Sequence, residues 1–191
     1  MILLIALLSY ILGSVPFGFI IGKIFFKTDL RRLGSGNVGA TNALRNFGKF
    51  AGFTTFLFDF LKGSLACYLG GKYGGELGQA VAMFFVVIGH MYSFILKFKS
   101  GKGVATSFGA LLTIDYRFAL ALLAIFIVLV LIFRIVSLSS ITTAIIAAVL
   151  SVFRYNISYL SLAIVLIASL VVFKHKDNIR RLKLGEEKKI F

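Results

Sequence analysis

Seven apolar runs dominate the chain, and they restrict it to folds that lie in a lipid bilayer. A helix needs about 20 apolar residues to cross the hydrocarbon core, with a lower limit near 17. The runs are continuous rather than alternating, which favours helices over the strands of a membrane barrel. We therefore predict an all-α integral membrane protein, a compact bundle of seven transmembrane helices. The runs cover residues 2–26, 50–71, 77–98, 103–114, 117–133, 138–153 and 157–173.

The composition excludes an ordinary soluble domain. Hydrophobic residues make up 59% of the chain and charged residues 15%, with a mean hydropathy of +0.98. A soluble domain has about 45–50% apolar and about 25% charged residues. The single cysteine, Cys67, excludes an internal disulfide. We expect one transmembrane domain over residues 1–191, with no metal and no cofactor.

Basic residues predict the orientation of the bundle. They gather in the connections 27–49 and 97–102 and after residue 174, and the net charge is +14. Lys and Arg are enriched in cytoplasmic loops. If all seven runs cross, these segments share the cytoplasmic side, with the N-terminus outside and the C-terminus inside. With seven crossings, the opposite side carries only Lys72, Arg117 and Arg154 as basic residues. The run 103–114 is short, so a half-span or a re-entrant helix remains an alternative for it.

The stretch 34–45 is the most informative motif. Its three glycines permit positive φ angles and close approach of the backbone to a ligand. Successive backbone N–H groups in such a loop form an anion-binding nest, and arginine binds phosphate or carboxylate with two parallel hydrogen bonds. The alternative is a flexible loop between helices. No strand precedes the G-x-G-x-x-G pattern, so we reject a dinucleotide site. The candidate ligands are Ser35, Gly36, Asn37, Thr41, Asn42 and Arg45.

A second glycine-rich stretch, 100–106, precedes the short apolar run. Gly101 and Gly103 flank Lys102 at the expected start of a helix, where unpaired N–H groups and the helix dipole bind anions. It is not a P-loop, because Gly103 stands where Ser or Thr is required. The alternative is a basic loop that touches anionic lipid.

Two histidines and a serine complete the candidates. His90 lies within an apolar run, where an ionisable group indicates a functional site, although a neutral, hydrogen-bonded histidine is the alternative. His175 and Asn178 follow the last run at a helical spacing, although such a basic tail is often a lipid anchor. Ser140 and its neighbours Ser137 and Ser139 open the sixth run. There they could cap the helix or bind phosphate, and capping is the interpretation we favour.

Ionisable groups also occur inside the second run. Asp59 and Lys62 are three residues apart, a spacing at which the side chains pair on a helix, and we interpret them as a structural ion pair. Pro16 in the first run predicts a kink.

Together these motifs resemble those of the bacterial acyl-phosphate:glycerol-3-phosphate acyltransferases, small multi-span enzymes that make lysophosphatidic acid. The resemblance runs over essentially the whole chain, and one departure is Ser100, where a glycine is expected. It implies transfer of an acyl group from acyl phosphate to the 1-hydroxyl of glycerol 3-phosphate, with release of inorganic phosphate. This reaction is the first committed step of phospholipid synthesis. The matching stretches are residues 13–16, 34–45, 89–90, 100–106 and 178–181.

The resemblance also implies roles for individual residues. Ser35, Arg45 and Asn178 are expected to hold glycerol 3-phosphate. The Lys102 loop and Thr41 or Asn42 are expected to hold the acyl phosphate. The candidate catalytic residues are Ser35, Arg45, Lys102, His90 and His175, and the candidate substrate-binding residues are Gly36, Asn37, Thr41, Asn42, Gly101, Gly103, Ser140 and Asn178.

The identity of the base stays open. The His-x-x-x-x-Asp dyad of other glycerolipid acyltransferases is absent, because Ile95 and Arg180 stand five residues after the two histidines. Either the leaving phosphate accepts the proton, or His90 or His175 does. Neither histidine has an orienting carboxylate at an evident spacing, which favours catalysis by positioning.

The expected partners are glycerol 3-phosphate, acyl phosphate, the lipid bilayer and an upstream enzyme that forms acyl phosphate, with no nucleic acid. We expect a bacterial inner-membrane protein whose active site faces the cytoplasm. The alternatives are a transporter of a phosphorylated solute, a membrane scaffold that binds anionic lipid, and an acyltransferase that uses acyl-CoA or acyl carrier protein.

Overall fold

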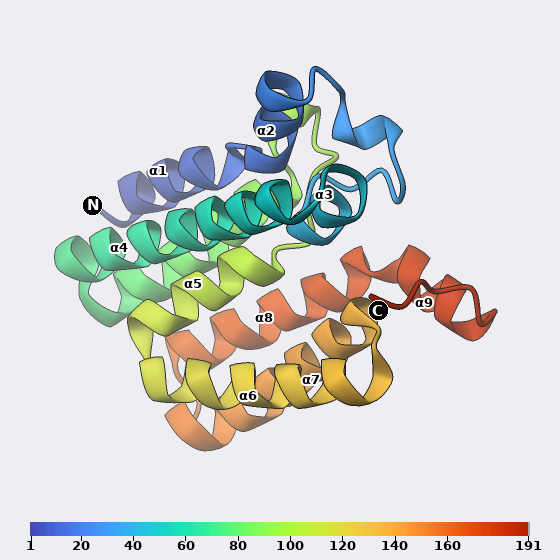
Figure 1. Ribbon diagram of the computed structural model, residues 1–191. Helices are drawn as coiled ribbons and strands as arrows, with labels where there is room; N and C mark the ends of the chain where they lie inside the picture. Colours follow the sequence, from blue (N-terminus) through green and yellow to red (C-terminus); the bar gives the residue numbers. More distant parts are fainter. Residues whose placement is uncertain (191) are drawn as a thin grey trace.

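The computed structural model describes residues 1–190, which form a bundle of helices (Figure 1). Phe191, the last residue of the expected domain, lies outside the described residues. The all-α prediction is confirmed, and each apolar run is helical. The helices are α1 (Ile2–Ser14), α2 (Phe17–Phe25), α3 (Ala40–Phe47), α4 (Lys49–Met91), α5 (Val104–Ile114), α6 (Tyr116–Phe133), α7 (Val136–Tyr155), α8 (Tyr159–Lys174) and α9 (Lys176–Lys183), with short 3-10 helices η1 (Leu30–Arg32) and η2 (Phe94–Leu96).

Several helical stretches are long and apolar enough to cross a membrane. Four meet this test, and a fifth does if α8 and α9, which are bent by 55°, count as one span. The chain is therefore a multi-pass membrane protein, while the number seven stays a prediction. The four stretches are Ile2–Phe25, Lys49–Leu96, Tyr116–Phe133 and Val136–Tyr155.

Two breaks divide the longest apolar segments. The helix ends before Pro16, which separates α1 from α2 and confirms the expected kink. Within α4, Gly75 has φ 57° and ψ −148°, a conformation that favours glycine. A methyl group on Gly78 would lie 2.2 Å from the carbonyl oxygen of Gly70, so the two halves of α4 pack against each other. Runs 50–71 and 77–98 thus form an antiparallel pair.

Glycines set the position of α5 against α4. A methyl group on Gly63 would lie 2.1 Å from the carbonyl oxygen of Thr106, and one on Gly109 would lie 2.0 Å from that of Phe60. Small residues at such positions allow helix backbones in a membrane to approach closely. The short helix α5 is therefore held directly on α4, and the Lys102 loop that precedes it is held as well.

Helices α6, α7 and α8 form a second group below α4 and α5 (Figure 1). The turn that joins α5 to α6 is fixed by Asp115. Its carboxylate accepts hydrogen bonds from the Phe118 backbone N–H at 3.0 Å, from Arg154 Nε at 2.9 Å and from the Tyr155 hydroxyl at 3.0 Å. The end of α7 is therefore fastened to the start of α6.

Candidate active site

A cavity of about 340 Å³ extends between the two groups of helices. Its volume is within the range of about 300–1,000 Å³ that is typical of ligand sites. One end is lined by polar and basic side chains, and the remainder by apolar side chains from α5 to α8. The structure brings most predicted site residues together here. These are Ser35, Asn37, Thr41, Asn42, Arg45, His90, Lys102, Gly103, Ser140, His175 and Asn178.

Two predicted binding residues, Gly36 and Gly101, do not line the cavity. Gly36 has φ 69°, and its N–H donates to the carbonyl oxygen of Leu33 at 2.9 Å, so it shapes the turn before α3. Gly101 lies against His90, since a methyl group on Gly101 would lie 1.9 Å from His90 Nε2. Both glycines position their loops, and direct binding of substrate by either stays a prediction.

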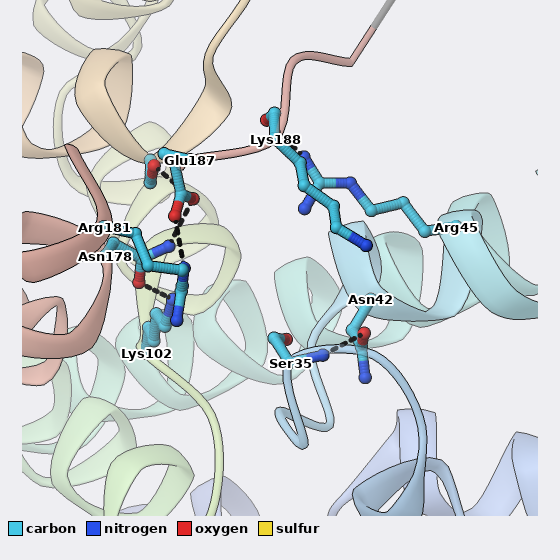
Figure 2. A network of polar contacts seen from close by, with 9 residues as sticks. Ser35, Asn42, Arg45, Lys102, Asn178, Arg181, Glu187 and Lys188 are labelled. Atoms are coloured by element: carbon cyan, nitrogen blue, oxygen red, sulfur yellow. Dashed lines mark hydrogen bonds and ion pairs between the residues drawn. The ribbon is translucent and has the colours of Figure 1, made fainter. Parts of the chain in front are cut away.

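Asn42 is buried, and its side chain fixes the 34–45 loop through hydrogen bonds (Figure 2). Its amide donates to the carbonyl oxygens of Leu33 at 3.0 Å and Asn37 at 2.8 Å. Its Oδ1 accepts from the backbone N–H of Ser35 at 3.1 Å and from Asn46 Nδ2 at 2.9 Å. Because its polar atoms are engaged within the protein, the geometry favours a positioning role for Asn42 over the direct substrate contact expected from the sequence.

A second polar group joins α5, α7 and α9 (Figure 2). Lys102 Nζ donates to Asn178 Oδ1, and Asn178 Nδ2 donates to Glu187 Oε1 at 2.6 Å. The same carboxylate accepts from Arg181 Nε at 2.6 Å and from the Ser137 hydroxyl at 2.8 Å. Glu187 thus holds Asn178 and Arg181 beside Lys102.

The segment after α9 returns to the site. The Arg45 guanidinium donates to the carbonyl oxygen of Lys188 at 2.8 Å, and the Ile190 N–H donates to the carbonyl oxygen of Arg134 at 2.8 Å. These contacts join the 34–45 loop, α9 and the start of α7 around the polar end of the cavity.

Burial and hydrogen bonding shift the pKa values in this group. Burial lowers the pKa of Lys102 to about 8, although the nearby Glu187 carboxylate favours the charged amine. Burial alone would raise the pKa of Glu187, but hydrogen bonds from Ser137, Asn178 and Arg181 outweigh it and hold this pKa below its usual value. At neutral pH the group contains an ionised carboxylate and a largely protonated Lys102.

His90 has a carboxylate neighbour that the sequence did not reveal. Its Nδ1 lies 3.4 Å from Asp59 Oδ1, and both side chains are buried. A carboxylate that no evident sequence spacing indicated therefore lies beside His90. Because Nδ1 faces Asp59 and Nε2 lies against Gly101, the geometry favours positioning of the Lys102 loop over the catalytic role expected for His90.

The predicted ion pair of α4 is present. Lys62 Nζ lies 2.7 Å from Asp59 Oδ1, and both side chains are almost completely buried. The same amine donates to the carbonyl oxygen of Val15 at 2.9 Å. Lys62 therefore satisfies a backbone carbonyl at the break between α1 and α2.

His175 lies between α8 and α9 and is buried at the polar end of the cavity. Its Nδ1 is 2.7 Å from the carbonyl oxygen of Val171. Because a carbonyl oxygen can only accept, Nδ1 carries the proton and Nε2 is left as a base. His175 is therefore the histidine whose geometry suits proton transfer.

The serines at the start of α7 do not cap it, so that interpretation is wrong. The hydroxyls of Ser139 and Ser140 donate to carbonyl oxygens four residues earlier, at 3.0 Å and 2.8 Å, and Ser137 binds Glu187. Ser140 still lines the cavity.

Several lining residues were missed by reasoning from the sequence. Arg181 and Glu187 meet Ser137 only after the chain turns back beyond α9, and Glu187 is one of three acidic residues in the basic tail. Ser107, in the first turn of α5, has a buried hydroxyl with no partner within the described residues. That hydroxyl and the N-terminus of α5 can bind an anion.

The arrangement can hold two anionic groups and one alkyl chain. Arg45, Lys102 and Arg181 supply positive charge at the polar end, and leucine, isoleucine and phenylalanine side chains line the remainder. Positive charges and N–H groups placed this way stabilise phosphate and the charge that develops during acyl transfer.

The comparisons with known proteins agree with this geometry. The family model described as "Glycerol-3-phosphate acyltransferase" matches residues 3–185. A glycerol-3-phosphate acyltransferase of Carboxydothermus hydrogenoformans is 47% identical over 100% of this chain and 97% of that protein, and one of Geobacillus kaustophilus is 42% identical over 98% and 95%.

Crystal structures of PlsY (YgiH), an integral membrane glycerol 3-phosphate acyltransferase, are 36% identical and cover 100% of this chain. The glycerol 3-phosphate form has a TM-score of 0.92 over 96% of that chain, and the lysophosphatidic acid form has 0.88 over 95%. By sequence and by structure, the chain belongs to the glycerol-3-phosphate acyltransferase family.

Proposed function

We propose that this protein transfers a fatty acyl group from acyl phosphate to the 1-hydroxyl of glycerol 3-phosphate. The products are lysophosphatidic acid and inorganic phosphate. The observation that carries the proposal is one cavity with a cationic end, formed by Arg45, Lys102 and Arg181, and an apolar remainder. Such a cavity accommodates two phosphate groups and one acyl chain. The PlsY structures in glycerol 3-phosphate and lysophosphatidic acid forms support this assignment.

The two phosphate groups are assigned to two adjoining sets of donors at the polar end. Ser35, Arg45 and Asn178 hold glycerol 3-phosphate. Lys102, Thr41 and the N-terminus of α5 hold the acyl phosphate. Supporting this division, Arg45 lies on α3, whereas Lys102 lies in the loop before α5 (Figure 2).

The reaction needs little more than positioning. The glycerol hydroxyl oxygen attacks the acyl carbonyl carbon, and the bond from that carbon to the phosphate oxygen breaks. The leaving phosphate accepts the proton directly, or His175 accepts it at Nε2 and passes it on. A mixed anhydride has a good leaving group, so orientation and charge neutralisation supply most of the catalysis.

We place the active site on the cytoplasmic face of a bacterial inner membrane, in a single domain with seven spans, the N-terminus outside and the C-terminus inside. Three observations support this placement. Gly75 divides α4 into two halves, and the basic segments 27–49, 97–102 and 174–190 meet at the polar end of the cavity. The Gly75 turn, the N-terminus and the α5–α6 turn lie at the other end (Figure 1).

Three substrate mixtures test the proposed reaction. Purified protein in a lipidic mesophase receives glycerol 3-phosphate with palmitoyl phosphate, with palmitoyl-CoA or with palmitoyl-acyl carrier protein. Lysophosphatidic acid and inorganic phosphate in equal amounts from palmitoyl phosphate alone are the expected result, and this donor implies an upstream enzyme that forms acyl phosphate. Product from another donor alone would reassign the donor. No product from any donor, together with uptake of glycerol 3-phosphate into vesicles, would support the transporter instead.

Activity should fall in alkaline solution as Lys102 loses its proton. Its pKa in the free protein is lowered to about 8, so the positive form is present below that pH and disappears above it. We expect kcat/KM for palmitoyl phosphate to decline through about pH 8. A bound phosphate dianion favours the protonated amine, so kcat should decline at a higher pH. The Lys102→Arg variant should lack the decline, because the arginine pKa is above about 12. The same decline in both proteins would contradict the assignment.

A further inference from the structure

The cavity has a defined depth along three helices, counted from its polar end. On α7 the lining extends from Ser137, which binds Glu187, to Ala147, and on α8 it extends from His175 to Ile164. At about 1.5 Å of rise per residue, the path is about 15 Å long on α7 and about 16.5 Å long on α8. On α6 the lining includes Leu122, which is 5% exposed. The lining includes no residue of α6 before Leu122, of α7 after Ala147 or of α8 before Ile164.

Below this level the helices pack directly on one another. The next residue on the same face of α7 is Ser151, which is fully buried and donates to its own helix at the carbonyl oxygen of Ala148, 2.8 Å away. One turn further on, the Tyr155 ring packs edge-on against Phe118 with ring centroids 5.7 Å apart. The Tyr155 hydroxyl is fixed by Asp115. We take this packed layer as the floor of the cavity.

The width of the cavity comes from small residues on α7. The lining positions of that helix recur every three or four residues, at 136–137, 140, 143–144 and 147, and hold no large side chain. They face leucine, isoleucine and phenylalanine side chains on α5, α6 and α8. The lining residues of α7 are Val136, Ser137, Ser140, Thr143, Ala144 and Ala147.

We propose that Ala147, above the floor formed by Phe118 and Tyr155, limits the length of the acyl chain that the protein transfers. The proposal rests on the proposed acyltransferase function. Because C–C bonds are about 1.5 Å long, an extended alkyl chain advances about 1.3 Å per methylene, and about 15 Å holds roughly a dozen methylene groups. A longer chain must bend or leave part of its length outside the cavity. A bulky side chain at position 147 raises the floor by several methylene lengths.

The experiment compares kcat/KM for palmitoyl phosphate and decanoyl phosphate at saturating glycerol 3-phosphate. Ala147→Phe should lower the palmitoyl-to-decanoyl ratio by at least about tenfold, since methylene contacts in a fitted pocket discriminate at that level. Activity with decanoyl phosphate shows that the variant is folded. The matched control is Val149→Phe, because Val149 is 53% exposed on the outer face of α7 and lies outside the cavity lining. It should keep the wild-type ratio.

Three further variants keep the proposal falsifiable if Ala147→Phe does not fold. Ala147→Val and Ala147→Leu should lower the ratio progressively, and Leu122→Ala should raise the ratio of stearoyl to palmitoyl phosphate. An active wild type with unchanged ratios in the Ala147 variants would overturn the chain-length proposal alone. A folded wild type that makes no lysophosphatidic acid from any acyl donor would overturn the proposed function itself.

Discussion

The Lys102→Met variant is expected to lose acyl transfer by a factor of about 10²–10³ in kcat/KM. Methionine keeps the length and apolar stem of lysine but removes its charge. Lys102 is half-buried and donates to Asn178, so water does not fully replace the missing cation. The phosphate that Lys102 neutralises would then be held by fewer donors, and the activation free energy for its departure would rise.

The control for this variant is Lys99→Met, in the same basic loop. Lys99 is exposed and does not line the cavity, so its loss should leave kcat/KM close to the wild-type value. Lysophosphatidic acid formation is measured for both proteins with palmitoyl phosphate and glycerol 3-phosphate. Near-normal activity of Lys102→Met would remove Lys102 from the proposed site, and equal losses in both would indicate a general effect of basic charge.

Asp59→Ala should destabilise the protein by about 3–5 kcal/mol, the usual cost of breaking a buried ion pair from one side. The Lys62 amine would remain in the bundle without its carboxylate, and it is only 3% exposed. His90 would lose its neighbour as well. Thermal unfolding in detergent, followed by circular dichroism, measures the loss.

A double variant separates the ion pair from the packing of Asp59. Asp59→Asn with Lys62→Met removes both charges while keeping side chains of similar size. Because it strands no charge, it should be more stable than Asp59→Ala, and the two single variants complete a mutant cycle. A midpoint for Asp59→Ala equal to that of the wild type would show that Lys62 is neutral or solvated in the native state.

The positions of the helices follow closely from local sequence, because a bilayer leaves few choices for an apolar run. The run 103–114 became α5 (Val104–Ile114), and Pro16 ends a helix as a residue without an N–H should. The turn between the runs 50–71 and 77–98 was harder to predict from the sequence. Helix continues up to Gly75, and only the positive φ angle of that residue turns the chain.

The site was predictable as a set of motifs, but the roles within it were not. Asn37, Arg45 and Lys102 lie where the glycine-rich stretches suggested. The pairing of His90 with Asp59, however, depends on the antiparallel packing of two halves of α4. Likewise, Glu187 meets Asn178 only after the chain turns back beyond α9. No short-range spacing encodes such contacts, so the sequence could not distinguish positioning residues from binding residues.

The return of the segment after α9 has a consequence for biosynthesis. The polar end of the cavity joins residues near position 35 to residues near position 187, and Glu187 holds Asn178 and Arg181 in place. During translation the early helices enter the membrane first. The site therefore assembles late, after nearly every helix has been inserted. A chain that ends within α8 would therefore lie in the membrane without Asn178, Arg181 and Glu187, and its site would be incomplete.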